Sequence, residues 1–175
     1  MNILITGRPG VGKTTVIRRV VESLQGRLGG FTTQEIRRGG RRVGFSIRAV
    51  DSGQEGVLAH IDLAGPHRVG PYGVNIADME RIGVSALHRA LKGADIIIMD
   101  EIGRMENYCP SFQSTVLRAL DAPQDVLGTL QMRSTPFLDR IRRREDVVIK
   151  PMTRENRGAM PMLLLDLFTG RQRVS

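Results

Sequence analysis

The sequence has a single cysteine, no tryptophan and few other aromatic residues. Cys109 is the one thiol among 175 residues, so the chain cannot close a disulfide within itself or supply a paired-cysteine metal clamp. With 2 tyrosines and 5 phenylalanines, it offers few rings on which single-stranded nucleic acid could stack. The composition favours a reducing compartment and argues against a stacking platform for single strands.

Long hydrophobic segments are also missing. No apolar stretch approaches the ~20 residues that a membrane-spanning helix needs. The first residues, 1–7, have neither a basic segment nor an apolar run of signal-peptide length. We therefore expect a cytoplasmic protein that does not bind membranes.

Acidic residues are outnumbered by basic ones. The 26 lysines and arginines exceed the 18 aspartates and glutamates, and the net charge is +8. This excess favours anionic partners such as nucleotides, nucleic acid or an acidic protein. Basic clusters at residues 37–42 and 140–144 fit a nucleic-acid surface, but a charged turn and a solvated helix face explain them more simply. The charge pattern alone does not decide whether nucleic acid is a partner.

The remaining pattern is typical of an α/β protein. Short apolar runs alternate with amphipathic stretches, which predicts a mostly parallel central sheet flanked by helices. Core strands are predicted at residues 2–6, 94–99, 125–130 and 147–149. Helices are predicted after residue 13, over 77–91, around Phe112–Leu120, after Thr135 and after Thr153. We expect a monomer with one domain over residues 1–170 and a tail at 171–175.

Residues 30–61 have a different pattern. Three β segments are predicted at 30–36, 43–50 and 56–61, and Gly39-Gly40 between the first two is a hairpin signal. The segment is therefore predicted to form an antiparallel β extension of the sheet. A glycine- and proline-rich loop is expected at 64–75.

The strongest motif lies directly after the first strand. Residues 7–14 match G-x-x-x-x-G-K-[ST] at every fixed position. The glycines let successive N–H groups point at phosphate oxygens, and the following helix adds its positive N-terminus. Lys13 is placed to reach the β- and γ-phosphates, and the Thr14 hydroxyl to bind Mg²⁺. The predicted phosphate cradle comprises Gly7, Arg8, Pro9, Gly10, Val11, Gly12, Lys13, Thr14 and Thr15.

An acidic pair follows the second apolar strand. Asp100 and Glu101 come after residues 96–99, and parallel strands present their carboxyl ends on the rim where such sheets bind ligands. Asp100 is predicted to hold Mg²⁺, and Glu101 to polarise the attacking water. A solvated acidic strand end is the alternative. Gln131 and Glu106 are the next candidates for the water.

Other polar residues fall on the same predicted rim. Arg104 and Arg133 each follow a core strand, so either could act as an internal arginine finger, and a surface arginine is the alternative for each. Asn156 and Arg157 are predicted to flank the base, although they could equally begin a helix. The three histidines show no metal-binding spacing.

Several motifs together resemble a known family. The matching segments are residues 7–15, 30–37, 72–75, 100–106 and 153–157. In this order they are similar to the small P-loop nucleoside triphosphatases of thermophilic archaea and bacteria, to which the human cancer-related nucleoside triphosphatase also belongs.

The resemblance implies a RecA-like α/β fold. It also implies slow Mg²⁺-dependent hydrolysis of ATP, GTP, CTP and UTP with little base preference. Asp100 and Glu101 match the family's metal-binding and catalytic carboxylates, and Lys13 and Arg104 complete the predicted catalytic set. The family often has lysine in place of Arg104 and an acid in place of Gln34. A nucleotide or nucleoside kinase and an NTP-regulated RNA-binding module are the alternative functions.

Overall fold

The computed structural model describes residues 1–172, with side chains through Gly170. In this part of the chain the strands are β1 (Asn2–Thr6), β2 (Leu28–Arg38), β3 (Arg41–Ala49), β4 (Glu55–His60), β5 (Arg68–Val69), β6 (Tyr72–Val74), β7 (Ile96–Ile102), β8 (Asp125–Leu130) and β9 (Val147–Pro151). The helices are α1 (Lys13–Ser23), α2 (Ile76–Asp78), the π-helical η1 (Met79–Val84), α3 (Ser85–Gly93), the 3₁₀ turn η2 (Met105–Tyr108), α4 (Pro110–Asp121), α5 (Pro136–Arg142) and α6 (Met160–Gln172).

All these strands belong to one sheet, in the order β5-β6-β4-β3-β2-β7-β8-β1-β9. The pairs from β2 through β9 are parallel, and those from β2 through β5 are antiparallel. Strand β2 belongs to both parts, since Leu28–Thr32 pairs with β7 and Phe31–Arg38 pairs with β3. The prediction of a parallel core with an antiparallel extension is confirmed.

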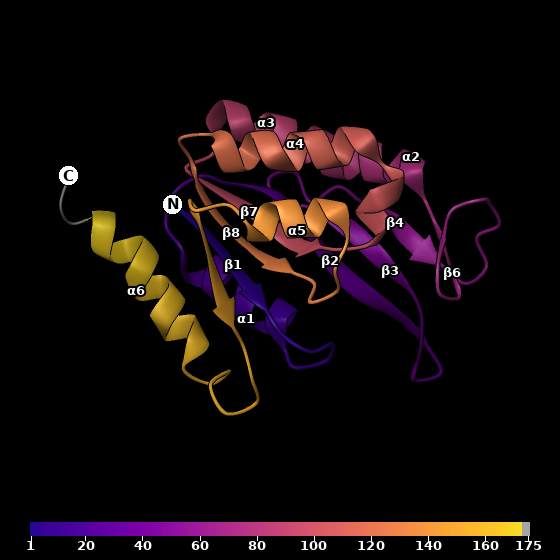
Figure 1. Ribbon diagram of the computed structural model, residues 1–175, viewed down its shortest axis with the longest axis horizontal. Helices are drawn as coiled ribbons and strands as arrows, with labels where there is room; N and C mark the ends of the chain where they lie inside the picture. Colours follow the sequence, from indigo (N-terminus) through magenta and orange to yellow (C-terminus); the bar gives the residue numbers. More distant parts are fainter. Residues whose placement is uncertain (173–175) are drawn as a thin grey trace.

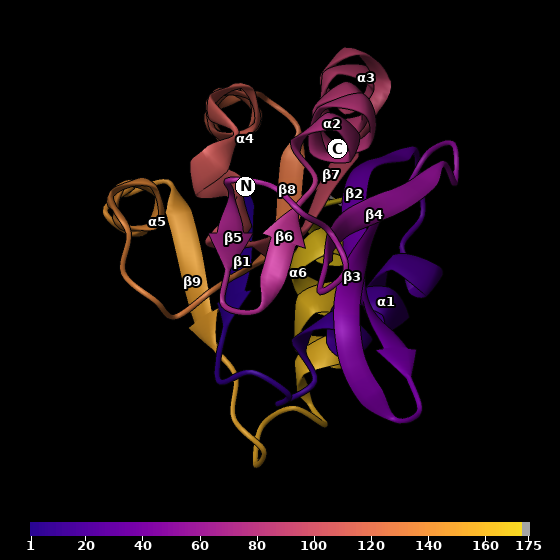
Figure 2. The same ribbon diagram turned by 90° about the vertical axis from the view of Figure 1, so that its right-hand side faces the viewer.

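Helices cover both faces of the parallel strands (Figure 1). Figure 2 shows α1 and α6 on one face and α3, α4 and α5 on the other. Successive strand residues point to opposite faces, so Ile3 and Ile5 pack with α1 and α6, whereas Leu4 belongs to the other core. None of the helices within residues 1–172 is long and apolar enough to cross a membrane.

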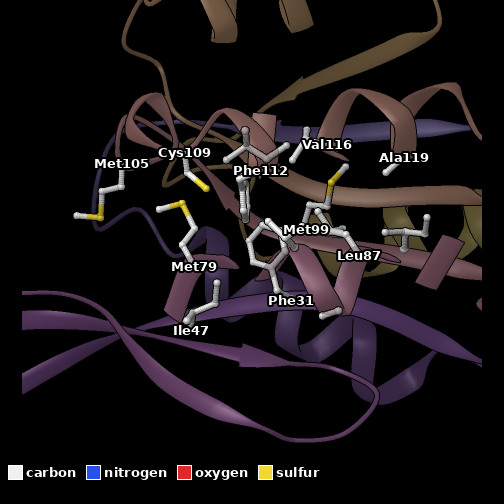
Figure 3. Packing of buried hydrophobic residues seen from close by; sticks show 14 of the residues in the cluster. Phe31, Ile47, Met79, Leu87, Met99, Met105, Cys109, Phe112, Val116 and Ala119 are labelled. Carbon is white, nitrogen blue, oxygen red and sulfur yellow. The ribbon is translucent and has the colours of Figure 1, made fainter. Parts of the chain in front are cut away.

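The larger core joins the extension to the parallel sheet. Phe31 of β2 meets Phe112 of α4 edge to face, with ring centroids 5.1 Å apart, and Figure 3 shows Met79 and Leu87 beside them. A Cβ on Gly83 would lie 2.8 Å from the Phe112 ring, so glycine is needed for η1 to approach α4. This packing holds β2 rigidly against β7, and thereby positions the extension.

Several predicted boundaries are corrected by the structure. The loop expected at 64–75 contains the short β5–β6 hairpin. The last helix begins at Met160 instead of just after Thr153, and Leu163, expected on its buried face, is 44% exposed. Helix α6 continues to Gln172, and the division into a domain at 1–170 and a tail at 171–175 stays a prediction. Residues 173–175 of that tail lie outside the described part.

Candidate active site

The loop predicted to bind phosphates connects β1 to α1 at the carboxyl end of β1. Gly10 and Gly12 have φ angles of 77° and 107°, which side-chain-bearing residues rarely adopt. Gly7 is needed for a different reason, because a Cβ there would lie 2.6 Å from the Met152 carbonyl oxygen. Lys13 lies in the loop with only 9% exposure, and its Nζ donates to the Gly7 carbonyl at 3.2 Å. The motif therefore forms a preorganised loop.

Asp100 lies near the end of β7, between β2 and β8, and is fully buried. Its Oδ1 accepts hydrogen bonds from Thr129 Oγ1 at 2.6 Å and Thr14 Oγ1 at 3.4 Å. Oδ2 has no hydrogen-bond partner within the described chain. Burial raises the Asp100 pKa to about 6, although the Thr129 hydrogen bond opposes this. A buried oxygen without a partner is costly, so this carboxylate suits a cation.

Glu101 follows Asp100 through a cis peptide bond and contacts different groups. Its Oε1 lies 3.2 Å from Lys13 Nζ, and its Oε2 accepts from Gln131 Nε2 at 2.8 Å. The Gln131 Oε1 in turn accepts from the Arg104 backbone N–H at 3.2 Å. Glu101 is therefore held beside Lys13, the lysine predicted to bind phosphates, while Asp100 is held beside Thr14.

Glu106 lies next to this group and is 3% exposed. Its Oε2 accepts from the Gly103 N–H at 2.9 Å. Burial raises the Glu106 pKa to about 7, and the negative charge of Glu101 adds to this effect. Gly103 itself packs on Gln131, because a Cβ there would lie 2.5 Å from Gln131 Nε2. The loop after β7 thus positions both Gln131 and Glu106.

One cleft of about 780 Å³ is lined by Lys13, Glu101, Glu106 and Gln131 together. The predicted site residues that border it are Gly7, Pro9, Gly10, Gly12, Lys13, Thr14, Thr15, Glu101 and Arg104. A second cleft, of about 600 Å³, borders Thr14, Thr15 and Asp100. Two loop residues border neither cleft: Val11 packs into the core below the loop, and Arg8 is exposed.

The comparisons with known proteins agree with this geometry. The model of an NTPase family matches residues 2–165. The chain belongs to this NTPase family. The nucleoside-triphosphatase THEP1 of Thermotoga sp. is 48% identical over 160 residues, which cover 91% of each chain. That of Thermofilum pendens is 44% identical over 165 residues, again with 91% of each chain covered.

Two solved structures have the same fold. The crystal structure of THEP1 from Aquifex aeolicus superposes with a TM-score of 0.87 at 36% identity, over 95% of this chain and 98% of that one. The solution structure of a human cancer-related nucleoside triphosphatase gives 0.80 at 35% identity, over 99% and 98%. The RecA-like P-loop fold and the resemblance inferred from the sequence motifs are confirmed.

Asn156 and Arg157, predicted to flank the base in this NTPase, border neither cleft. The Asn156 Oδ1 accepts from the Thr153 N–H at 2.8 Å, and its Nδ2 donates to the Pro151 carbonyl at 3.0 Å. Asn156 therefore shapes the turn that follows β9, next to the Met152 carbonyl under the phosphate loop. Base contact by these residues stays a prediction.

The side chains around Asp100 suit a magnesium ion that is also bound by phosphates. Within residues 1–172 there is no cluster of three or more His, Cys, Asp or Glu side chains that could hold a metal alone. Mg²⁺ is commonly bound by one or two protein oxygens, substrate phosphates and water. The unpartnered Asp100 Oδ2 and the neighbouring Thr14 hydroxyl meet that requirement.

Sequence patterns missed the hydrogen-bonded set around the acidic pair. Thr129 lies near the end of β8 and Gln131 directly follows it, and of the two the sequence indicated only Gln131, as a candidate for positioning the water. Their bonds to Asp100 and Glu101 join residues 29 and 30 positions apart. Phe45 and Tyr72, which also border the cleft, carried no chemical signal.

Proposed function

We propose that this protein binds NTP with Mg²⁺ and hydrolyses it to the nucleoside diphosphate and phosphate. The observation that carries the proposal is the meeting of Lys13 with Glu101, beside Thr14 and Asp100, at one rim of the sheet. Relatives over most of the chain are named nucleoside triphosphatases, which supports the same conclusion.

Each side chain has a distinct role in this proposal. The N–H groups of the phosphate-binding loop and Lys13 hold the β- and γ-phosphates. The Glu101 carboxylate orients a water and accepts its proton, while Gln131 fixes the carboxylate. The water oxygen bonds to the γ-phosphorus as the bond from phosphorus to the β–γ bridging oxygen breaks. Arg104, on the same cleft, stabilises the charge that develops.

Thr14 and Asp100 are the residues that would hold Mg²⁺. The ion, when bound, neutralises phosphate charge. The buried Asp100 carboxylate is positioned for this by its bond from Thr129. Its raised pKa is consistent with a carboxylate whose ionised form needs a cation partner.

We further propose that the enzyme discriminates bases poorly, because loop N–H groups and a metal recognise only the triphosphate. The proposal includes a monomer acting in the cytoplasm. Nucleic acid is a proposed additional partner, because residues 37–42 form a basic cluster.

The decisive experiment separates chemistry from binding at the acidic pair. Glu101→Gln retains the shape of the side chain and removes its proton acceptor, so kcat should fall by about 10²-fold while NTP·Mg²⁺ affinity stays close to that of the wild type. Asp100→Asn should weaken Mg²⁺-dependent binding as well as turnover. Calorimetric titration and phosphate release give the two quantities, with the exposed Glu155→Gln as the matched control.

Wild-type turnover in Glu101→Gln would show that another group activates the water. Equal loss of binding in both variants would show that the two carboxylates do not divide metal binding and catalysis between them.

A further inference from the structure

The main cleft extends well beyond the phosphate-binding loop. Thr32 of β2 pairs with Asp100 of β7, so the rest of β2 continues past the rim of the parallel sheet. Strands rise about 3.3 Å per residue, which places Glu35 about 10 Å beyond the level of Asp100. Figure 2 shows the β2–β3 hairpin reaching out on the side where β1 and β9 end. The extension therefore forms a wall above the site of the terminal phosphate.

This distal wall consists of Gln34, Glu35, Arg42, Phe45 and Tyr72, all of which border the cleft. The Phe45 and Tyr72 rings meet edge to face with centroids 5.2 Å apart. The Arg42 guanidinium lies 5.2 Å from the Phe45 centroid and 5.8 Å from that of Tyr72. It also donates to the Tyr72 hydroxyl at 3.0 Å and to Glu35 Oε1 at 2.9 Å. The wall thus combines the partly buried Phe45 ring, backed by the buried Tyr72, with an exposed Gln34 amide. Its Glu35 carboxylate is held in ion pairs by Arg37 and Arg42.

The bound NTP does not need this wall for its own nucleoside. Lys13 and the metal ligands engage the β- and γ-phosphates, so Glu101 marks the γ-phosphate end of the nucleotide. Within the cleft, the distal wall lies beyond the β7 rim that carries Glu101. The nucleoside of the NTP is attached through the α-phosphate, at the end of the triphosphate opposite to Glu101. With the triphosphate in this orientation, the nucleoside of the NTP extends away from the distal wall.

We propose that the distal wall binds a second molecule, a ribonucleoside, as a phosphoryl acceptor in place of water. The flat base packs against Phe45, which Tyr72 supports edge to face, as bases do on aromatic side chains. The Glu35 carboxylate and the Gln34 amide hydrogen-bond the ribose hydroxyls. The inference rests on the proposed function, because the donor is the NTP held by the phosphate-binding loop.

The chemistry differs from hydrolysis only in the attacking group. A ribose hydroxyl oxygen bonds to the γ-phosphorus, and the bond from phosphorus to the β–γ bridging oxygen breaks. The hydroxyl proton passes to the Glu101 carboxylate. The products are a nucleoside monophosphate and the nucleoside diphosphate, so no oxidant or further reactant is required. Hydrolysis is then the reaction that remains when the acceptor is absent.

The test is product analysis with ATP that carries a radioactive γ-phosphate, with Mg²⁺ and each of adenosine, guanosine, cytidine and uridine. The measured quantity is the ratio of labelled nucleoside monophosphate to labelled inorganic phosphate. This ratio does not depend on how much of a variant is folded. The wild type should label at least one nucleoside, in amounts that rise with its concentration.

Substitutions in the distal wall should change this ratio. Phe45→Ala removes a stacking surface, so it should raise the KM for the nucleoside by about tenfold, and the ratio at low nucleoside concentration should fall accordingly. Phe45→Leu, which keeps much of the volume, should give a smaller decrease. Tyr108→Ala is the matched control, because Tyr108 does not border the cleft and its hydroxyl bonds to the Arg68 carbonyl.

The outcomes separate the two proposals. Phosphate release without any labelled nucleoside overturns the acceptor site and leaves NTP hydrolysis intact. Absence of both products overturns the proposed function itself. If labelled nucleoside monophosphate forms, but its ratio to labelled phosphate is the same in Phe45→Ala as in the wild type, the acceptor does not bind at the distal wall.

Discussion

The burial of Glu106 leads to a stability effect that depends on pH. The carboxyl group is 3% exposed, and burial raises its pKa from 4.5 to about 7. Between these values the native state holds a proton that the unfolded chain has lost. The proton on Glu106 therefore stabilises the native state. This stabilisation is complete below pH 4.5, decreases as the pH rises, and is lost above pH about 7. Glu106→Gln has no such proton and should escape this loss.

The size of the effect follows from the two pKa values. At about 1.4 kcal/mol per pH unit, the difference between 4.5 and about 7 corresponds to about 3 kcal/mol. Relative to wild type, the free energy of unfolding of Glu106→Gln should therefore increase by about that amount between pH 4.5 and pH 8. The glutamine can still accept from the Gly103 N–H, so any other cost should be nearly constant with pH. Asp100 is present in both proteins, and its own titration cancels in the difference.

Urea unfolding followed by circular dichroism at half-unit pH steps measures this difference directly. The exposed Glu145→Gln is the matched control for the loss of one carboxylate. A difference between Glu106→Gln and wild type that stays constant from pH 4.5 to pH 8 would refute the reasoning, because Glu106 would then titrate alike in both states.

Three further outcomes are expected. Thr135→Ala should cost about 1 kcal/mol in urea unfolding, because Thr135 caps α5 through the Leu138 N–H, whereas Thr135→Ser should cost little. Gly103→Ala should displace Gln131 and lower kcat several-fold with little change in melting temperature; unchanged kcat, or equal loss in Gly158→Ala, would contradict this. Finally, kcat/KM for ATP, GTP, CTP and UTP should agree within about tenfold, and a hundredfold preference would point to specific base contacts near Asn156.

Local patterns were sufficient for the parallel core and for the phosphate-binding loop. The strands at residues 2–6 and 125–130 have the predicted bounds, because a buried parallel strand is an unbroken apolar run. The Thr135-Pro136 start of α5 was also readable, since a cap and a proline at the first turn act within a few residues. The hairpin at Gly39-Gly40 is equally local, with both glycines at positive φ.

Boundaries failed where packing outweighed local pattern. Thr153 has the sequence features of a helix cap, yet it begins a turn that Asn156 closes, and α6 starts only at Met160. Residues 64–75 look like a loop because glycine and proline dominate, but Tyr72–Val74 gains strand pairing from β4. Such short strands are stabilised by their neighbours and carry little signal of their own.

The sequence by itself determined the family, the fold class and the position of the glycine-rich loop between β1 and α1, because a loop between one strand and one helix is specified by contiguous residues. Only the tertiary structure decided which side chains contact Asp100 and which contact Glu101. Asp100 meets Thr14 and Thr129, and Glu101 meets Lys13, across separations of up to 88 positions. Those contacts depend on the order in which β7, β8 and β1 pair. No local periodicity encodes that order, since each strand is a similar apolar run.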